Sequence, residues 1–149
     1  MVMKSTVLEE LIALLGLALL EIDAEIESLH VSRTSEGKSS AGDKHETGRA
    51  MIDQALQHIE SQRAKTAKML ADARGLTSSP CDTVRAGALV KAAGGWFLLA
   101  VSWGKLTLQG GDSVAVVSPI SPVAQAMLGK RVGDTFELNG RQSIVEWVG

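Results

Sequence analysis

The sequence is poor in several residue types, and each shortage excludes a class of protein. It has one cysteine, Cys81, in 149 residues, so the chain forms no intramolecular disulfide and suits a reducing compartment. The three histidines (His30, His45 and His58) lack metal-ligand spacing, so no structural zinc site is expected. The net charge of -2 argues against a general nucleic-acid-binding protein, because such proteins are usually basic.

Long apolar runs are also scarce. The most apolar stretch is LIALLGLALL, residues 11–20, which is well short of the roughly 20 residues needed to cross a bilayer. Glu9 and Glu10 precede it where a signal peptide would carry basic residues, and no small-residue cleavage site follows. We therefore expect a soluble, cytoplasmic protein with no membrane partner.

Aromatic residues and prolines are few, and they are confined to one part of the chain. All five aromatic residues and all three prolines lie beyond residue 79, and 11 of the 15 glycines lie at or after Gly75. The composition changes at GLTSSPC, residues 75–81, whose Gly, Ser and Pro are typical of a linker. The sequence therefore predicts an N-terminal domain over residues 1–74, a linker over 75–81 and a C-terminal domain over 82–149.

The first segment has the apolar spacing of an antiparallel coiled-coil hairpin. Two sets of seven residues are spaced alternately by four and three: Leu8, Ile12, Leu15, Leu19, Ile22, Ile26 and Leu29, then Ile52, Leu56, Ile59, Arg63, Thr66, Leu70 and Ala73. Such spacing is that of a coiled-coil seam, although Arg63 and Thr66 weaken the second set. When the sets are paired in opposite directions, the two residue numbers of each pair add to 81 or 82. The tip of the hairpin is therefore expected near residues 37–46.

The charges of the two predicted helices also favour their pairing. From Lys4 to His30 there is one lysine and there are six acidic residues, whereas from Arg49 to Arg74 there are five basic and three acidic residues. An acidic helix attracts a basic one, although exposed ion pairs each add only tenths of a kcal/mol.

The second segment predicts short strands and one short helix. Residues 87–93, 95–102, 105–108 and 112–118 are rich in apolar and β-branched residues and are punctuated by glycine. Residues 122–128 begin with proline and predict a short helix. Asn139-Gly140 suits a type I′ turn between two alternating runs, so residues 136–148 predict a hairpin. The fold class is α+β: the coiled-coil hairpin, then a small antiparallel sheet with a helix packed on one face.

The turn of the hairpin carries two acidic residues, Asp43 and Glu46, three positions apart after Gly42. A helix of about 25 residues is about 37 Å long, so this acidic pair is expected far from the C-terminal domain. The same residues fit a capping box, with Asp43 as N-cap of the second helix and Glu46 reaching back to it. Local sequence alone favours this capping role over a functional one.

Two motifs give the sequence a resemblance to the Gre family of bacterial transcript-cleavage factors. The tip GDKHET keeps the family's Gly-Asp-x-x-Glu element at Gly42, Asp43 and Glu46. Near the C-terminus, SPVAQAMLGKRVGD is similar to the family's Ser-Pro motif and the Val-Gly-Asp that follows it. It agrees at these positions: Ser121, Pro122, Ala126, Leu128, Gly129, Lys130, Val132, Gly133 and Asp134. The sequence departs from the family at Lys44, His45 and Thr47 in the tip, and at Ala124 and Gln125 in the second motif.

The resemblance implies a function as an accessory factor of RNA polymerase and not as an enzyme by itself. The coiled coil would enter the secondary channel of the polymerase, and an FKBP-like C-terminal domain would dock on the channel rim. Asp43 and Glu46 would share a Mg²⁺ ion with the polymerase and promote hydrolysis of backtracked RNA near its 3′ end. The resemblance also implies partner-binding roles for Gly42, Ser121, Pro122, Gly129 and Lys130.

Three functions remain open. The first is stimulation of transcript cleavage, and the second is regulation or inhibition of the polymerase from the same channel without cleavage. The third belongs to another class: a coiled-coil interaction module in which Asp43 and Glu46 only cap a helix.

Overall fold

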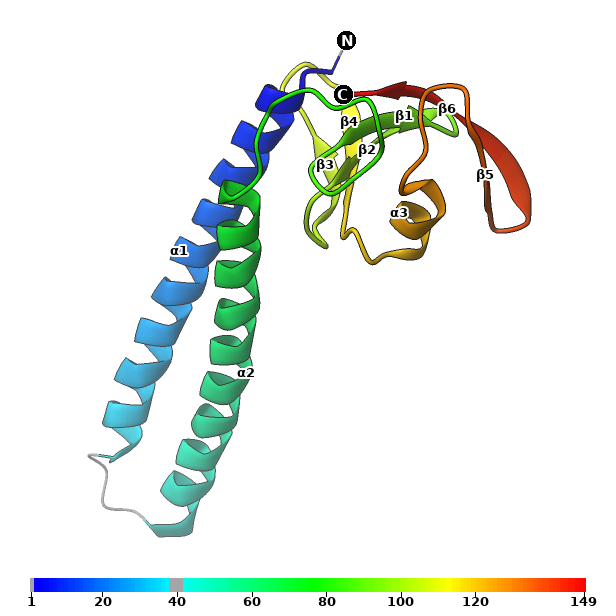
Figure 1. Cartoon of the computed structure of the whole chain (residues 1–149). Coiled ribbons are helices and arrows are strands. Elements are labelled where there is room, and N and C mark those ends of the chain that lie inside the picture. Colours follow the sequence, from blue (N-terminus) through cyan, green and yellow to red (C-terminus); the bar gives the residue numbers. More distant parts are fainter. Residues whose placement is uncertain (1, 38–41) are drawn as a thin grey trace. The chain divides into compact units, whose positions relative to one another are not determined.

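The computed structural model of the protein describes the backbone of residues 2–37 and 42–149 and the side chains of residues 2–35 and 46–149 (Figure 1). Two long helices come first, and six strands and a short helix follow. Their bounds are α1 Lys4–Gly37, α2 Gly42–Arg74, β1 Leu89–Ala92, β2 Gly95–Leu99, β3 Gly104–Thr107, β4 Ser113–Val117, α3 Pro122–Met127, β5 Thr135–Leu138 and β6 Arg141–Val148. Each of the predicted strands and helices is present, with bounds within a few residues of those expected.

The chain divides into two compact units. The helical unit consists of residues 14–70, and the globular unit consists of residues 1–13 together with 71–149. Both α1 and α2 therefore contribute residues to the two units. The predicted linker at residues 75–81 and the domain bounds on either side of it stay predictions.

In the helical unit, α1 and α2 run side by side in opposite directions (Figure 1). Five of the expected seam residues in this unit are buried: Leu15 on α1, and Leu56, Ile59, Thr66 and Leu70 on α2. Further along α1, Ile22, Ile26 and Leu29 are partly buried while most of their neighbours are exposed. This alternation follows the predicted spacing, which confirms the helical hairpin and its seam.

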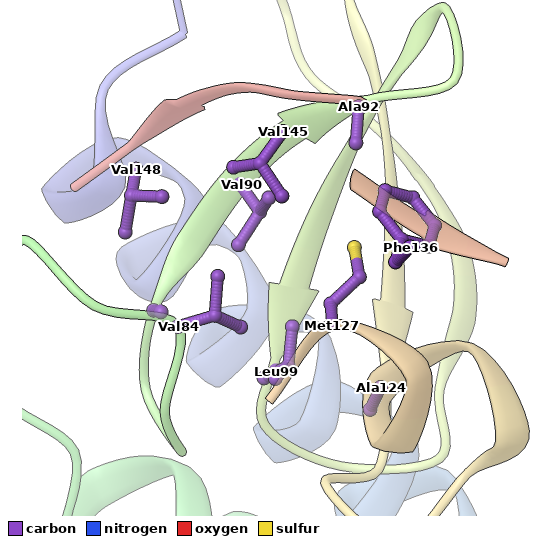
Figure 2. Packing of buried hydrophobic residues seen from close by; sticks show 10 residues of the cluster. Val84, Val90, Ala92, Leu99, Ala124, Met127, Phe136, Val145 and Val148 are labelled. Atoms are coloured by element: carbon purple, nitrogen blue, oxygen red, sulfur yellow. The ribbon is translucent and has the colours of Figure 1, made fainter. Parts of the chain in front are cut away.

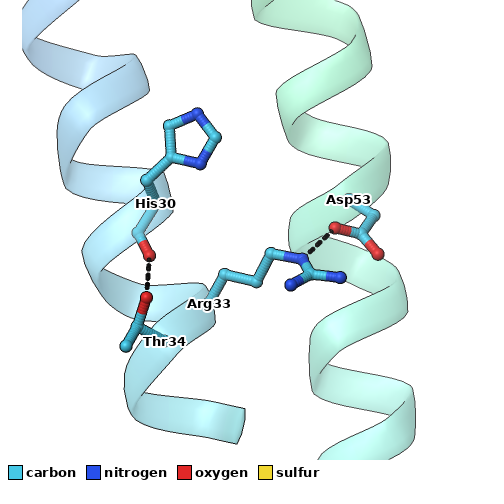
Figure 3. A network of polar contacts seen from close by, with 4 residues as sticks. All are labelled: His30, Arg33, Thr34 and Asp53. Atoms are coloured by element: carbon cyan, nitrogen blue, oxygen red, sulfur yellow. Dashed lines mark hydrogen bonds and ion pairs between the residues drawn. The ribbon is translucent and has the colours of Figure 1, made fainter.

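Two ion pairs join the helices beside the seam. Arg33 on α1 donates from Nε to Oδ1 of Asp53 on α2 at 2.6 Å (Figure 3). Arg63 on α2 donates in the same way to Asp23 on α1 at 2.5 Å. In both pairs the two residue numbers add to 86, so one antiparallel register holds along this part of the hairpin.

The globular unit contains one six-stranded sheet in the order β3-β4-β2-β1-β6-β5, together with α3. The α+β class is confirmed, but the sheet is not wholly antiparallel as expected, because β2 and β4 are parallel. The strand between them, β3, turns back onto the far edge of β4. The short connection between β3 and β4 indicates that these two strands form a hairpin. No local sequence signal indicates that β2 is the second neighbour of β4.

One face of this sheet packs on α3 and forms the core of the globular unit. Figure 2 shows Met127 and Ala124 of α3 facing Val90, Leu99 and Phe136 from the strands. These five residues are at most 5% exposed, so the short helix is fixed to the sheet by its buried side. The outward residues of α3 remain available for other contacts.

The first residues of α1 are held within the globular unit by a buried lysine. Lys4 Nζ donates to the carbonyl oxygens of Ser79, at 2.8 Å, and Gly149, at 3.3 Å. Cys81 Sγ donates to the same Gly149 oxygen at 3.2 Å. Burial lowers the pKa of Lys4, since a charged ammonium loses hydration there. Two residues of the predicted linker thus form hydrogen bonds with residues near the chain ends: Ser79 with Lys4, and Cys81 with Gly149.

Within the described residues, no helix combines the length and the apolar character that a membrane span requires.

Candidate functional site

The predicted acidic pair lies at the start of α2. Gly42 is the first residue of this helix, Asp43 the second, and Glu46 follows within the same helical segment. Glu46 is exposed, whereas the side chain of Asp43 lies outside the described residues. Positions three apart in a helix lie on the same side of it, so the backbone brings these two acidic positions together.

The start of α2 bears on the capping alternative. A capping box with Asp43 as N-cap requires Asp43 to stand immediately before the helix. The helix is assigned from Gly42, and a helix end is defined only to within one or two residues. The side chain of Asp43 lies outside the described residues, so the capping role stays a prediction.

The hairpin places this acidic pair at one end of the helical unit. Asp43 precedes Leu70 by 27 residues along α2, which corresponds to about 40 Å at 1.5 Å per residue. The ion pair between Arg33 and Asp53 shows that the two helices are still paired ten residues from Asp43. A carboxylate carried at such a helix end can reach into a narrow space that a globular domain could not enter.

Asp43 and Glu46 supply oxygen ligands, which Mg²⁺ prefers, but two carboxylates do not complete a site for this ion. Among the described residues, no group of three or more His, Cys, Asp and Glu side chains is arranged to hold a metal. This search does not include Asp43, whose side chain lies outside the described residues, so the Mg²⁺ site shared with a second protein stays a prediction.

The second motif forms α3 and the turn after it. Ser121 is the N-cap of α3: its hydroxyl accepts from the Ala124 backbone N–H at 3.4 Å and donates to the Ser118 carbonyl at 2.7 Å. Pro122 is the first residue of the helix, where a missing N–H costs nothing. The predicted partner-binding residues Ser121 and Pro122 thus have a clear role in starting α3.

Gly129 and Lys130 form the turn that closes this segment. Gly129 has a φ of +79°, which favours glycine, and its N–H donates to the Val84 carbonyl at 2.8 Å. The carbonyl of Lys130 accepts from the Val84 N–H at 2.8 Å. The backbone of this turn is therefore fixed to residue 84, while the Lys130 side chain remains half-exposed.

Two apolar residues, one just before this motif and one within it, have an exposure that was not expected from the sequence. Ile120 immediately precedes Ser121 and is 83% exposed, and Val132 follows closely after Lys130 and is 58% exposed. Their side chains are accessible to a partner, although single exposed apolar residues are common on protein surfaces. Their position in turns next to Pro119 and Gly133 was the available signal.

Among the comparisons with known proteins, the match to a family model covers the second motif and not the tip. Residues 109–148 match the family described as "Transcription elongation factor, GreA/GreB, C-term", and this range contains β4, α3, β5 and β6. The crystal structure of the GreA factor homolog 1 (Gfh1) protein of Thermus thermophilus is similar at 19% identity and a TM-score of 0.40, over 93% of this chain and 94% of that one. A structure of the transcription factor Gfh1 is similar at 19% identity and a TM-score of 0.39, over 92% of each chain. The comparison with curated proteins finds no match.

Proposed function

We propose that the chain belongs to the Gre family, whose C-terminal model matches residues 109–148, and that it is a transcription elongation factor that inserts its helical hairpin into the secondary channel of RNA polymerase. The observation that carries this proposal is the match over residues 109–148 together with the acidic pair at the start of α2. The protein acts as an accessory factor in the cytoplasm, and the polymerase performs the hydrolysis.

Asp43 and Glu46 bring two negative charges to the polymerase active site. Together with polymerase residues they would hold a Mg²⁺ ion, and this ion would polarise the water that attacks the backtracked RNA. The helical backbone fixes the spacing of the two acidic positions, so both carboxylates approach from one side. Lys44 and His45 lie between them and distinguish this tip from the family motif.

The segment from Ile120 to Val132 docks on the rim of the channel. Ser121, Pro122 and Gly129 shape this segment, as their capping and turn geometry supports. Ile120 and Val132 supply exposed apolar contact area at its two ends. The half-exposed Lys130 supplies a positive charge for an acidic partner surface.

Regulation of the polymerase without cleavage is the second candidate function. The specific observation in its favour is the departure of Lys44, His45 and Thr47 from the family tip. A basic residue between two carboxylates weakens their combined negative charge, and so their hold on a divalent cation. Binding to the polymerase is common to both functions, and RNA cleavage separates them.

Capture of core RNA polymerase by the purified full-length protein tests the proposal. We expect wild-type protein to retain the polymerase, and the double variant Ile120→Ser/Val132→Ser to retain several-fold less. Ile144→Ser is the matched control, since Ile144 is also exposed, at 47%, but lies on β6. If the wild-type protein captures no polymerase, the interaction-module alternative stands instead.

A further inference from the structure

The helix α1 carries a second coiled-coil pattern on the side opposite to the hairpin seam. Leu17, Leu20, Ala24, Glu27 and Val31 follow one another at spacings of three, four, three and four. We call this set the outer seam. At 100° per residue it lies about 160° around the helix from Leu15, Ile22 and Ile26, which face α2.

The outer seam is exposed throughout. Leu17 is 56% exposed, Leu20 is 67% exposed and Val31 is 58% exposed, and Ala24 and Glu27 are also exposed. Helices that pack by one face usually carry polar residues on the other, so apolar residues at heptad spacing on both faces indicate two helical neighbours. Within the helical unit, α2 is the neighbour of one face only.

The charge around the outer seam identifies the chemistry of the missing neighbour. From Leu14 to Ser32, α1 contains no lysine or arginine. Glu21 is exposed on one side of the outer seam, Asp23 is exposed on its other side, and Glu27 lies within it. An apolar stripe with acidic flanks is complementary to a helix that has apolar a and d positions and basic flanking residues.

A second copy of this chain does not meet these requirements. Its own α1 would place acidic residues against Glu21, Asp23 and Glu27. On the described part of α2, Met51 is the single large apolar residue that is highly exposed, so α2 of another copy offers no apolar stripe. We propose that the outer seam binds a basic amphipathic helix of a partner protein, and this proposal does not depend on the polymerase-channel function.

Synthetic helices of about four heptads provide the test. The basic helix has Leu at a and d and Lys at e and g; an acidic helix has Glu at e and g; a third peptide has Lys at e and g but Gln at a and d. Fluorescence anisotropy with the labelled peptides measures binding to the full-length protein. We expect the basic apolar helix to bind at least about tenfold more tightly than either of the others. Its affinity should fall as salt is added.

Protein variants locate the site. Leu17→Gln/Leu20→Gln should weaken binding of the basic helix by about tenfold or more, whereas Met51→Gln, which removes an exposed apolar side chain on α2, should not. Far-UV circular dichroism should show unchanged helix content in both. Equal binding of the basic and acidic helices, or unchanged binding by the outer-seam variant, would overturn the proposal. So would dimerisation in sedimentation that Leu17→Gln/Leu20→Gln abolishes, because the second copy would then be the partner.

Discussion

Arg63 on α2 donates a hydrogen bond from Nε to Oδ1 of Asp23 on α1, with 2.5 Å between the two atoms. Judged by the spacing of the seam alone, Arg63 should weaken the hairpin, because it stands where an apolar residue is expected. The structure shows how the hairpin accommodates it: the guanidinium reaches an acidic residue at the edge of α1. The charge difference between the two helices is thus used in a specific contact.

The Asp23–Arg63 pair predicts a pH effect. The hydrogen bond from Arg63 lowers the pKa of Asp23, so the stabilisation is present above the ordinary aspartate pKa and is lost as pH falls through the depressed value. Carboxyl NMR titration should show Asp23 returning to its ordinary range in Arg63→Gln. Asp53, whose pKa Arg33 lowers independently, is the internal control and should not move. An unchanged Asp23 titration in the variant would show that the pair does not form in solution.

The buried seam predicts the cost of truncation. Ile59 is 5% exposed, so Ile59→Ala should cost about 2–4 kcal/mol of the free energy of unfolding, through lost burial and a cavity. Met51→Ala is the control, since Met51 on the same helix is 65% exposed and should change stability by less than about 0.5 kcal/mol. Urea unfolding followed by far-UV circular dichroism measures both. Equal costs at the two positions would mean that the register is wrong.

The turn between β1 and β2 predicts a stabilising substitution. Ala93 and Gly94 have φ values of +50° and +78°, the conformation of a two-residue hairpin turn that favours Asn-Gly over Ala-Gly. Ala93→Asn should therefore raise stability by about 0.5–1 kcal/mol, because asparagine tolerates this conformation better than alanine. Ala93→Val should lower it. Tryptophan fluorescence during unfolding reports the change, because Trp96 lies on β2; a less stable Asn variant would contradict the turn geometry.

Much of the fold follows from the sequence because its signals are local. Apolar residues spaced alternately by four and three positions predict the helical hairpin. Asn139-Gly140, with φ values of +53° and +76°, forms the predicted turn between β5 and β6. The family match over residues 109–148 confirms the resemblance that the Ser-Pro motif indicated. The parallel pairing of β2 with β4 was missed because it joins strands that no local turn connects.

The candidate site was less predictable. The acidic pair follows from its spacing, but its metal ligation and partners depend on a second protein. The exposure of Ile120 and Val132 was not predicted, because sequence alone does not reveal that apolar residues in a turn stay exposed. The family motif also mixes two roles: Ser121 and Gly129 are required to build α3 and its turn, whether or not they touch a partner.

The two roles of this motif can be separated by substitution. Ser121→Ala removes the N-cap of α3 and should lower the stability of the globular unit by about 1 kcal/mol. Lys130→Ala should leave stability within about 0.5 kcal/mol of wild type but reduce polymerase capture. Thermal unfolding and capture are measured on the same samples. Loss of stability in Lys130→Ala, or full capture, would remove this residue from the proposed docking surface.

The release of 3′ RNA fragments from a stalled, backtracked elongation complex tests the central claim most directly. Wild-type protein and Asp43→Asn/Glu46→Gln are compared at equal occupancy of the polymerase. The change removes both negative charges while nearly preserving size and helix-capping ability. The account predicts stimulated cleavage by the wild-type protein, no stimulation by the variant and equal binding of the two. Equal stimulation by both proteins, or binding without stimulation by the wild type, would contradict it.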